Sequence, residues 1–120
     1  MTKASIPQPP PIDGGIDVGA SLEATLTRLY LFGADASTAP TIHDALELVQ
    51  ERRAFGLAKY GQPLRTLDGR DGVEDLRQEL GDALMYTHKL YLTDRLTAEQ
   101  HKALILHLIT TLSIIPKVTT

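Results

Sequence analysis

The sequence contains no cysteine, which excludes both disulfide bonds and a zinc site built from thiolates. It also has no apolar run approaching the roughly 20 residues that a membrane span requires. The first residues lack the basic-then-apolar pattern of a signal peptide. We therefore expect a soluble, cytoplasmic protein that has no membrane partner.

An excess of basic charge is also missing, because 12 Lys and Arg stand against 15 Asp and Glu, for a formal net charge of −3. Such a balance provides no overall positive field for the phosphate backbone of a nucleic-acid polymer. A mononucleotide is not excluded, since a metal ion and a few local cations are enough to hold it. The length of 120 residues and the 42% hydrophobic content fit one globular domain with its own core.

Proline and glycine are concentrated at the N-terminus, with Pro7, Pro9, Pro10, Pro11, Gly14, Gly15 and Gly19. Proline disfavours helix and glycine raises the entropic cost of ordering the chain. We predict that residues 1–19 form a flexible arm, either a free tail or a segment that packs on a neighbouring subunit. Residues 20–120 are predicted to form a single all-α domain.

Apolar residues recur at helical spacing in four segments. The predicted helices span residues 21–32, residues 41–60 with Thr41 as the cap, residues 73–93, and a last segment that opens with a capping box at Thr97 and ends at Pro116. Four helices joined by short loops predict an all-α, four-helix bundle-like fold.

Acidic residues share one face on two of these helices. Glu47 and Glu51 are four residues apart, and Asp75, Glu79 and Asp82 are spaced by four and three, so each set lies on one side of its helix. Both sets are expected on the shoulder of the buried face. The alternative is a solvated face, with Glu51 paired to Lys59 and Glu79 paired within the turn of Arg77, each pair worth only tenths of a kcal/mol.

Carboxylates that converge from two packed helices repel one another and need a counter-charge. Hard divalent cations such as Mg²⁺ or Mn²⁺ prefer oxygen ligands, bind phosphate oxygens and lower the pKa of bound water. The acidic pattern therefore predicts a metal site that acts on a phosphate ester or anhydride.

The flanking residues resemble the MazG-like nucleotide pyrophosphohydrolases, and most of all their small phage-encoded members. The resemblance covers roughly residues 42–92 and rests on ERRAFGLAKYGQPL at 51–64, Gly-Arg-Asp at 69–71 and DLRQELGDALMY at 75–86. The family pattern is Glu-Glu-x-x-Glu on one helix and Glu-x-x-Asp on the next. Glu79 and Asp82 match the second half, whereas Leu48 replaces the second acid of the first half, which leaves the number of metal ions open.

The resemblance implies the all-α NTP pyrophosphatase fold and the hydrolysis of a nucleoside triphosphate, a purine dNTP such as dGTP or dATP, to the monophosphate and pyrophosphate. It also implies Mg²⁺ or Mn²⁺ as cofactor, a homodimer or homotetramer, and the cytoplasm of a bacterium or phage-infected host. Glu47, Glu51, Glu79 and Asp82 would be the metal ligands, with Asp75 or Asp71 as a further candidate. Glu47 or Glu51 would instead orient or deprotonate the attacking water.

Three cations are candidates for binding the phosphates: Lys59, Arg70 and, more weakly, Arg53. The four histidines, His43, His88, His101 and His107, show no ligand spacing among themselves and are expected to be structural or exposed. Two alternatives stay open beside the leading function. One is a dUTPase-like or phosphoribosyl-ATP-like hydrolase of the same fold, and the other is a non-enzymatic helical assembly module whose acids are simply solvated.

Overall fold

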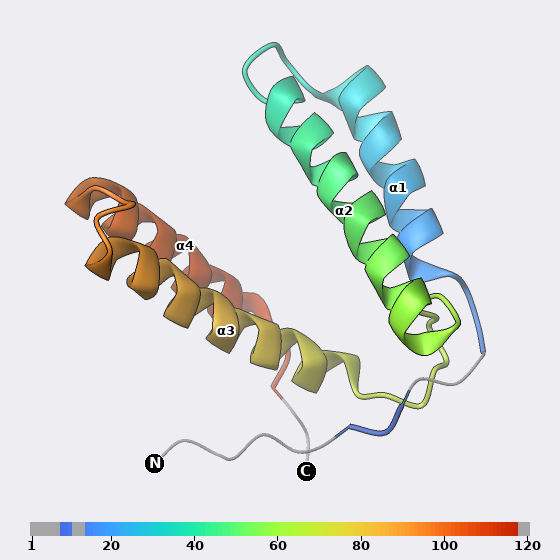
Figure 1. Cartoon of the computed structure of the whole chain (residues 1–120). Coiled ribbons are helices and arrows are strands. Elements are labelled where there is room, and N and C mark those ends of the chain that lie inside the picture. The colour runs from blue at the N-terminus through green and yellow to red at the C-terminus, as the bar shows by residue number, and fades with distance from the viewer. Residues whose placement is uncertain (1–7, 11–13, 118–120) are drawn as a thin grey trace. The chain divides into compact units, whose positions relative to one another are not determined.

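The computed structural model describes residues 8–10 and 14–117, and in these ranges the chain forms four helices and no strand (Figure 1). They are α1 (Val18–Arg28), α2 (Ala39–Tyr60), α3 (Gly72–Leu92) and α4 (Ala98–Ile114). A turn of π-helix, η1 (Leu29–Gly33), continues α1. The predicted all-α class is confirmed. Across these ranges no helix has both the length and the apolar character needed to cross a bilayer.

The chain divides into two compact units at residue 70, where one domain had been expected for residues 20–120. Among the described residues, 9–10 and 14–70 make the first unit, in which α1 and η1 pack along α2. Gln8 and residues 71–117 make the second, in which α3 packs along α4. Each unit is therefore a helical hairpin, and each is described separately below.

The expected arm ends earlier than predicted, because α1 begins at Val18. Asp17 caps this helix by accepting a hydrogen bond from the backbone N–H of Ala20. Residues 14–17 run beside residues 64–67. The backbone N–H of Val18 donates to the carbonyl of Leu64 at 2.8 Å, and that of Thr66 donates to Ile16 at 3.0 Å. Of the arm predicted for residues 1–19, residues 1–7 and 11–13 lie outside the described residues.

The start of α2 is set by Asp35 and not by Thr41, so the predicted cap is wrong. The Asp35 carboxylate accepts hydrogen bonds from the backbone N–H groups of Ser37 and Thr38, which turn the chain into the helix. Pro40 then occupies the first turn, where its missing N–H costs no hydrogen bond. The predicted stop is confirmed, since Gly61 ends α2 with a φ of 72° that favours glycine.

The α3–α4 hairpin follows the prediction closely. Asp71 caps α3 through the backbone N–H groups of Val73 and Glu74, and the capping box of Thr97 and Gln100 opens α4 as expected. Leu80, at 8% exposure, is the one hydrophobic residue that is buried among the described residues. A hairpin of two helices encloses little apolar volume, so most of its other apolar side chains stay partly exposed.

The turn at Asp35 predicts a pH dependence. Hydrogen bonds from the Ser37 hydroxyl and from the Thr38 and Ser37 backbones lower the pKa of Asp35 from 3.8 to about 2. Because the folded value lies below the unfolded one, the contribution of this carboxylate to stability is present above pH 3.8 and is lost as the pH falls toward 2. A titration of the Asp35 carboxyl carbon by NMR should give the low pKa directly.

An Asp35→Asn variant provides the matched comparison for melting temperatures measured over the same interval. It should lose less stability than the parent between pH 4 and pH 2, since it has no carboxylate to protonate. Parallel curves for parent and variant would contradict this assignment.

Candidate metal centre

Glu47 and Glu51 lie on the side of α2 that faces away from α1. The residues of α2 that are partly buried include Ile42, Leu46 and Val49, whereas Glu47 and Glu51 are both exposed. At about 100° per residue, the two acids fall on the arc opposite Val49. Their expected position on the shoulder of the buried face is therefore wrong. The reason is that the inward side of α2 runs through Ile42, Leu46 and Val49, whereas Phe55 and Leu57 are about half exposed, at 52% each.

Of the acids of α3, Asp82 points away from the partner helix and Glu79 lies on the flank of the buried side. Leu80 and Thr87 are buried on the side that faces α4, while Glu79 and Asp82 are exposed and Asp75 is half-buried. Asp82 falls about 160° around the helix from Leu80. The structure thus places Glu47 and Glu51 on the outer side of α2 and Asp82 on the outer side of α3, whereas Glu79 lies on the flank of α3, about 100° from Leu80.

Ion pairs do not neutralise these carboxylates. Over residues 8–10 and 14–117, Glu51, Glu79 and Asp82 make no salt bridge and no side-chain hydrogen bond. The pairing expected for a simply solvated helix face, Glu51 with Lys59 or Glu79 within the turn of Arg77, is not formed. Two like charges held about one turn apart without a cation repel each other, so each pair favours binding a positive ion.

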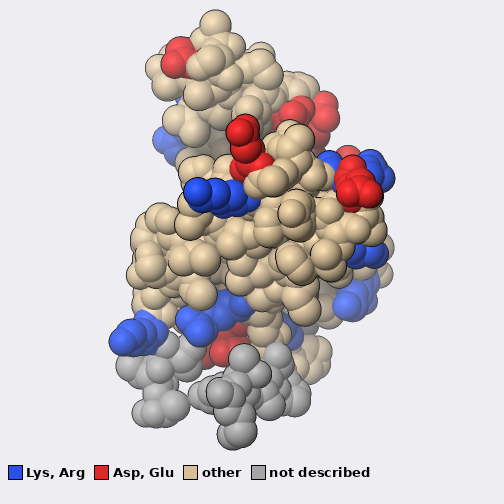
Figure 2. Space-filling view, turned by 90° about the vertical axis from the view of Figure 1, so that its left-hand side faces the viewer, with Lys and Arg blue, Asp and Glu red and all other residues tan. Residues whose placement is uncertain are grey.

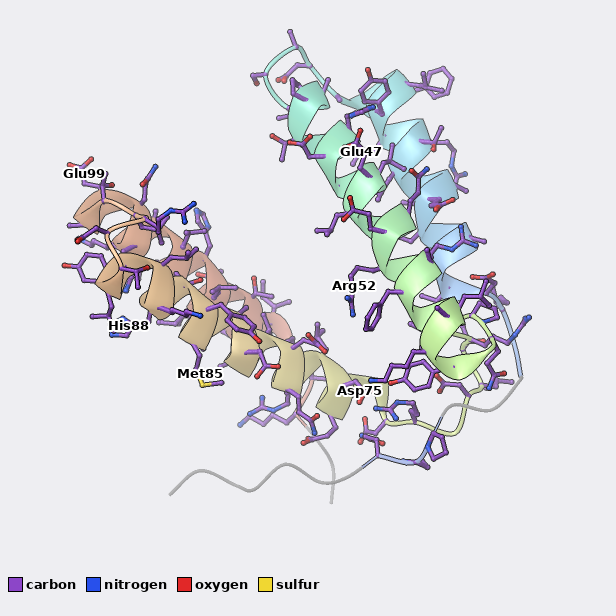
Figure 3. The ribbon with its side chains drawn as sticks, in the orientation of Figure 1. Glu47, Arg52, Asp75, Met85, His88 and Glu99 are labelled. Carbon is purple, nitrogen blue, oxygen red and sulfur yellow. The ribbon has the colours of Figure 1, made fainter. Side chains whose placement is uncertain are left out.

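A histidine stands beside the first of these acids. His43 Nδ1 lies 3.6 Å from a carboxylate oxygen of Glu47, and one ligand atom each from His43, Asp44 and Glu47 all lie within 4.8 Å of one another. Figure 3 shows Glu47 on α2. Sequence reasoning missed this group because it compared histidines only with histidines. The i, i+4 spacing of His43 and Glu47 was the available signal.

Of the two further acids considered for the metal shell, Asp71 already has another role. One of its carboxylate oxygens accepts hydrogen bonds from Val73 N and Glu74 N at 3.0 and 3.2 Å, as the cap of α3. Asp75 lies one turn before Glu79 and is half-buried. Asp71 is therefore committed to capping α3, and Asp75 as a further ligand stays a prediction.

The cation candidates differ in how they are held. Lys59 is exposed near the end of α2, and its ammonium group lies 5.1 Å from the ring centre of Tyr60. Arg70 is half-buried, and its guanidinium donates to the carbonyl of Pro9. Its backbone N–H donates to Asp68, a buried carboxylate at 5% exposure that the sequence analysis did not single out. Asp68 shapes the loop from which Arg70 extends.

Arg53 has a structural role that the prediction of a phosphate contact did not anticipate. Its guanidinium lies 2.9 Å from a carboxylate oxygen of Glu23 and 3.4 Å from one of Asp17, both of which precede or belong to α1. The hydrogen bond to Glu23 is the main cause of a raised pKa for Arg53. A Cβ at Gly19 would come within 2.6 Å of the Arg53 side chain, so only glycine allows this approach. Arg53 is therefore committed to joining α1 and α2.

A hollow in the first unit does not contain the acids. It measures about 590 Å³ between α1, α2 and the segment after α2, and its wall is mostly apolar, with Val18, Leu22 and Val49 among its residues. Neither Glu47 nor Glu51 lines it. This hollow suits aliphatic groups and not a metal-bound phosphate.

Comparison of the chain with protein-family models, with curated proteins and with solved structures found no match. The resemblance of residues 42–92 to MazG-like enzymes therefore stays a prediction.

The role of Arg53 predicts that Arg53→Ala will destabilise the first unit, because Glu23 and Asp17 would lose their shared counter-charge. The melting temperature and the urea midpoint should both fall. Arg52→Ala is the matched control. The Arg52 guanidinium lies over the ring of Phe55, 4.4 Å from its centre, and makes no salt bridge in the described part of the chain. Equal stability of the two variants would show that the Arg53 ion pairs do not hold the hairpin.

Proposed function

We propose that the protein is a metal-dependent nucleoside triphosphate pyrophosphohydrolase, which converts a (deoxy)nucleoside triphosphate to the monophosphate and pyrophosphate. The substrate we favour is a purine dNTP, dGTP or dATP, and the cofactor is Mg²⁺ or Mn²⁺. The proposal includes the finer fold assignment, a bundle-like subunit of the all-α NTP pyrophosphatase type.

The observation that carries the proposal is the set of exposed carboxylates on α2 and α3, Glu51, Glu79 and Asp82, that have no cationic partner among the described residues. The motif residues Glu79 and Asp82 occur at the family spacing, and the structure leaves both side chains accessible. A helix that merely solvates its acids gains by pairing them with Lys or Arg at i+3 or i+4. No Lys or Arg stands three or four residues from Glu51, Glu79 or Asp82, so these carboxylates remain accessible to a metal ion.

The donor set fits a hard divalent cation, since Glu47, Glu51, Glu79 and Asp82 offer only carboxylate oxygens. When bound, Mg²⁺ or Mn²⁺ would neutralise phosphate charge and lower the pKa of a coordinated water. Of the residues that would hold it, Glu47 or Glu51 accepts a proton from the attacking water. The water oxygen bonds to the α-phosphorus, the bond from that phosphorus to the α–β bridging oxygen breaks, and pyrophosphate leaves with its electron pair.

Lys59 and Arg70 are the proposed contacts to the phosphate chain. Lys59 is exposed, and among the described residues its ammonium group is not paired with an acid. Arg70 adjoins Asp71 in the Gly-Arg-Asp element, immediately before the helix that carries Glu79. Arg53 does not enter the proposal, because Glu23 and Asp17 already hold its guanidinium. Basic and acidic side chains are interspersed on the face shown in Figure 2, in keeping with a mononucleotide substrate and not a nucleic-acid polymer.

The protein is also proposed to act as a homodimer or homotetramer. On α4 the side that faces α3 carries Ile105, Leu108 and Leu112, which are partly buried. Leu106 and Ile109 lie farther around the helix and are 52% and 49% exposed. An apolar surface of this kind on a helix is typical of an interface, and a second copy of the chain would cover it.

The activity is tested by measuring pyrophosphate release from all common NTPs and dNTPs, with and without Mn²⁺. The parent should release pyrophosphate only with metal and should favour dGTP or dATP. Asp82→Asn and Glu79→Gln should each reduce turnover by on the order of 100-fold or more, because each removes a ligand that stabilises charge in the transition state.

Glu99→Gln on α4 is the matched control and should retain parental turnover, since this acid lies outside the motif. Preferential hydrolysis of dUTP or of phosphoribosyl-ATP would replace the substrate assignment and keep the fold. Failure of every triphosphate, together with no metal-dependent rise in melting temperature, would instead favour a non-enzymatic assembly module.

Sedimentation velocity at micromolar concentration tests the oligomer. The parent should sediment as a dimer or tetramer, and the double change Leu106→Glu with Ile109→Glu should shift it to monomer, because burying two carboxylates at an interface is costly. Lys102→Glu, one turn before Leu106 on the same side of α4, is the control for added negative charge. A monomeric parent would refute the proposed assembly.

A further inference from the structure

Two histidines meet across the α3–α4 hairpin, although 13 residues separate them in the sequence. His88 Nδ1 of α3 lies 3.1 Å from His101 Nε2 of α4. The ring of Tyr91 stacks on that of His101, with centroids 4.1 Å apart and planes inclined by 20°. Figure 3 shows His88 on α3. Linear spacing could not reveal this pair, because it depends on how the two helices align.

We propose that His88 and His101 form a binding site for a borderline divalent metal ion such as Zn²⁺, Ni²⁺ or Cu²⁺. Two imidazole nitrogens bound to one ion at about 2.05 Å are about 2.9 Å apart at a right angle and about 3.3 Å apart at the tetrahedral angle. The observed 3.1 Å lies between these values. The separation of the two nitrogens therefore already fits one ion, and rotation of the two rings brings their lone pairs onto it.

The protonation of the two rings is compatible with this role. In the hydrogen-bonded pair one of the two facing nitrogens carries a proton and the other accepts it. When both nitrogens bind metal, each neutral ring keeps its single proton on its other nitrogen, Nε2 of His88 and Nδ1 of His101. Both rings remain neutral, so the change is a shift of tautomer with no net loss of a proton.

The surroundings prepare the pair for a ligand. His88 is exposed and His101 half-buried, so an ion can reach the site from solvent. Tyr91 restrains the His101 ring by stacking, which reduces the entropy lost on binding. In the part of the chain that the structure describes, no third His, Asp or Glu side chain is placed to complete this site. Water would fill the remaining positions, and the affinity is expected to be weaker than that of a four-ligand structural zinc site.

This site would differ in chemistry and in consequence from the carboxylate centre. Mg²⁺ prefers oxygen donors, whereas imidazole suits zinc, copper and nickel. Binding at His88 and His101 would tie α3 to α4 near the turn that joins them, and would stabilise a hairpin in which Leu80 is the one buried large aliphatic side chain among the described residues. The inference does not depend on the proposed hydrolase activity.

The test is a zinc titration of the full chain, prepared without a histidine tag and followed by melting temperature and by calorimetry. Zinc should raise the melting temperature of the parent. His88→Gln and His101→Gln should each weaken zinc binding by about 10-fold or more. His107→Gln on the same helix as His101, and His43→Gln in the group with Asp44 and Glu47, should bind zinc as the parent does.

Parental zinc affinity in both His88→Gln and His101→Gln would overturn the proposal. Loss of binding in His43→Gln alone would do the same and would assign the ion to the His43, Asp44 and Glu47 group. Circular dichroism checks that the variants keep their helices. If one does not, ¹⁵N chemical shifts of the parent imidazoles on adding zinc decide, because ligation must shift His88 Nδ1 and His101 Nε2 and leave His107 unchanged.

Discussion

A pair of helices can bury only one side of each member, and this limit governs most of what the structure shows. In both units the hairpin partner covers the inward side of each helix, so all the remaining residues of that helix face outward. Acids and large aliphatic side chains consequently share the outer surfaces of α2, α3 and α4. A bound cation would neutralise the like charges. A second protein surface would cover the exposed apolar area.

Polar contacts specify the geometry where apolar burial is small. The Arg53 guanidinium fixes the start of α1 against α2 through Asp17 and Glu23, and the His88–His101 contact does the same for α3 and α4. Caps at Asp17, Asp71 and Thr97 determine where three of the helices begin. Such interactions are modest individually, but they are directional, so they define which side of each helix turns inward.

Local patterns were enough to predict the four helices, and the capping box at Thr97 was correct to the residue. Predictions that depended on contacts between distant parts of the chain were less accurate. The sequence pattern predicts Thr41 as the cap of α2 and misses Asp35. The turn before α2 depends on the Asp35 carboxylate accepting hydrogen bonds from the Ser37 and Thr38 backbones, which spacing alone does not show. Arg53 was grouped with the phosphate contacts because its partners lie 30 and 36 positions earlier. The acids were placed on a shoulder because periodicity alone does not show which side of α2 meets α1.

The pairing of residues 14–17 with residues 64–67 joins positions 50 apart in the chain, as in the bond between Ile16 N and the Thr66 hydroxyl. A contact of this separation carries a loop-closure entropy that no local hydrogen bond repays. The pairing becomes favourable only after α1 and α2 have docked and have brought residues 14–17 near residues 64–67. The segment is therefore expected to close last during folding and to open first, so that among the hydrogen-bonded amides of the first unit its own exchange fastest with deuterium.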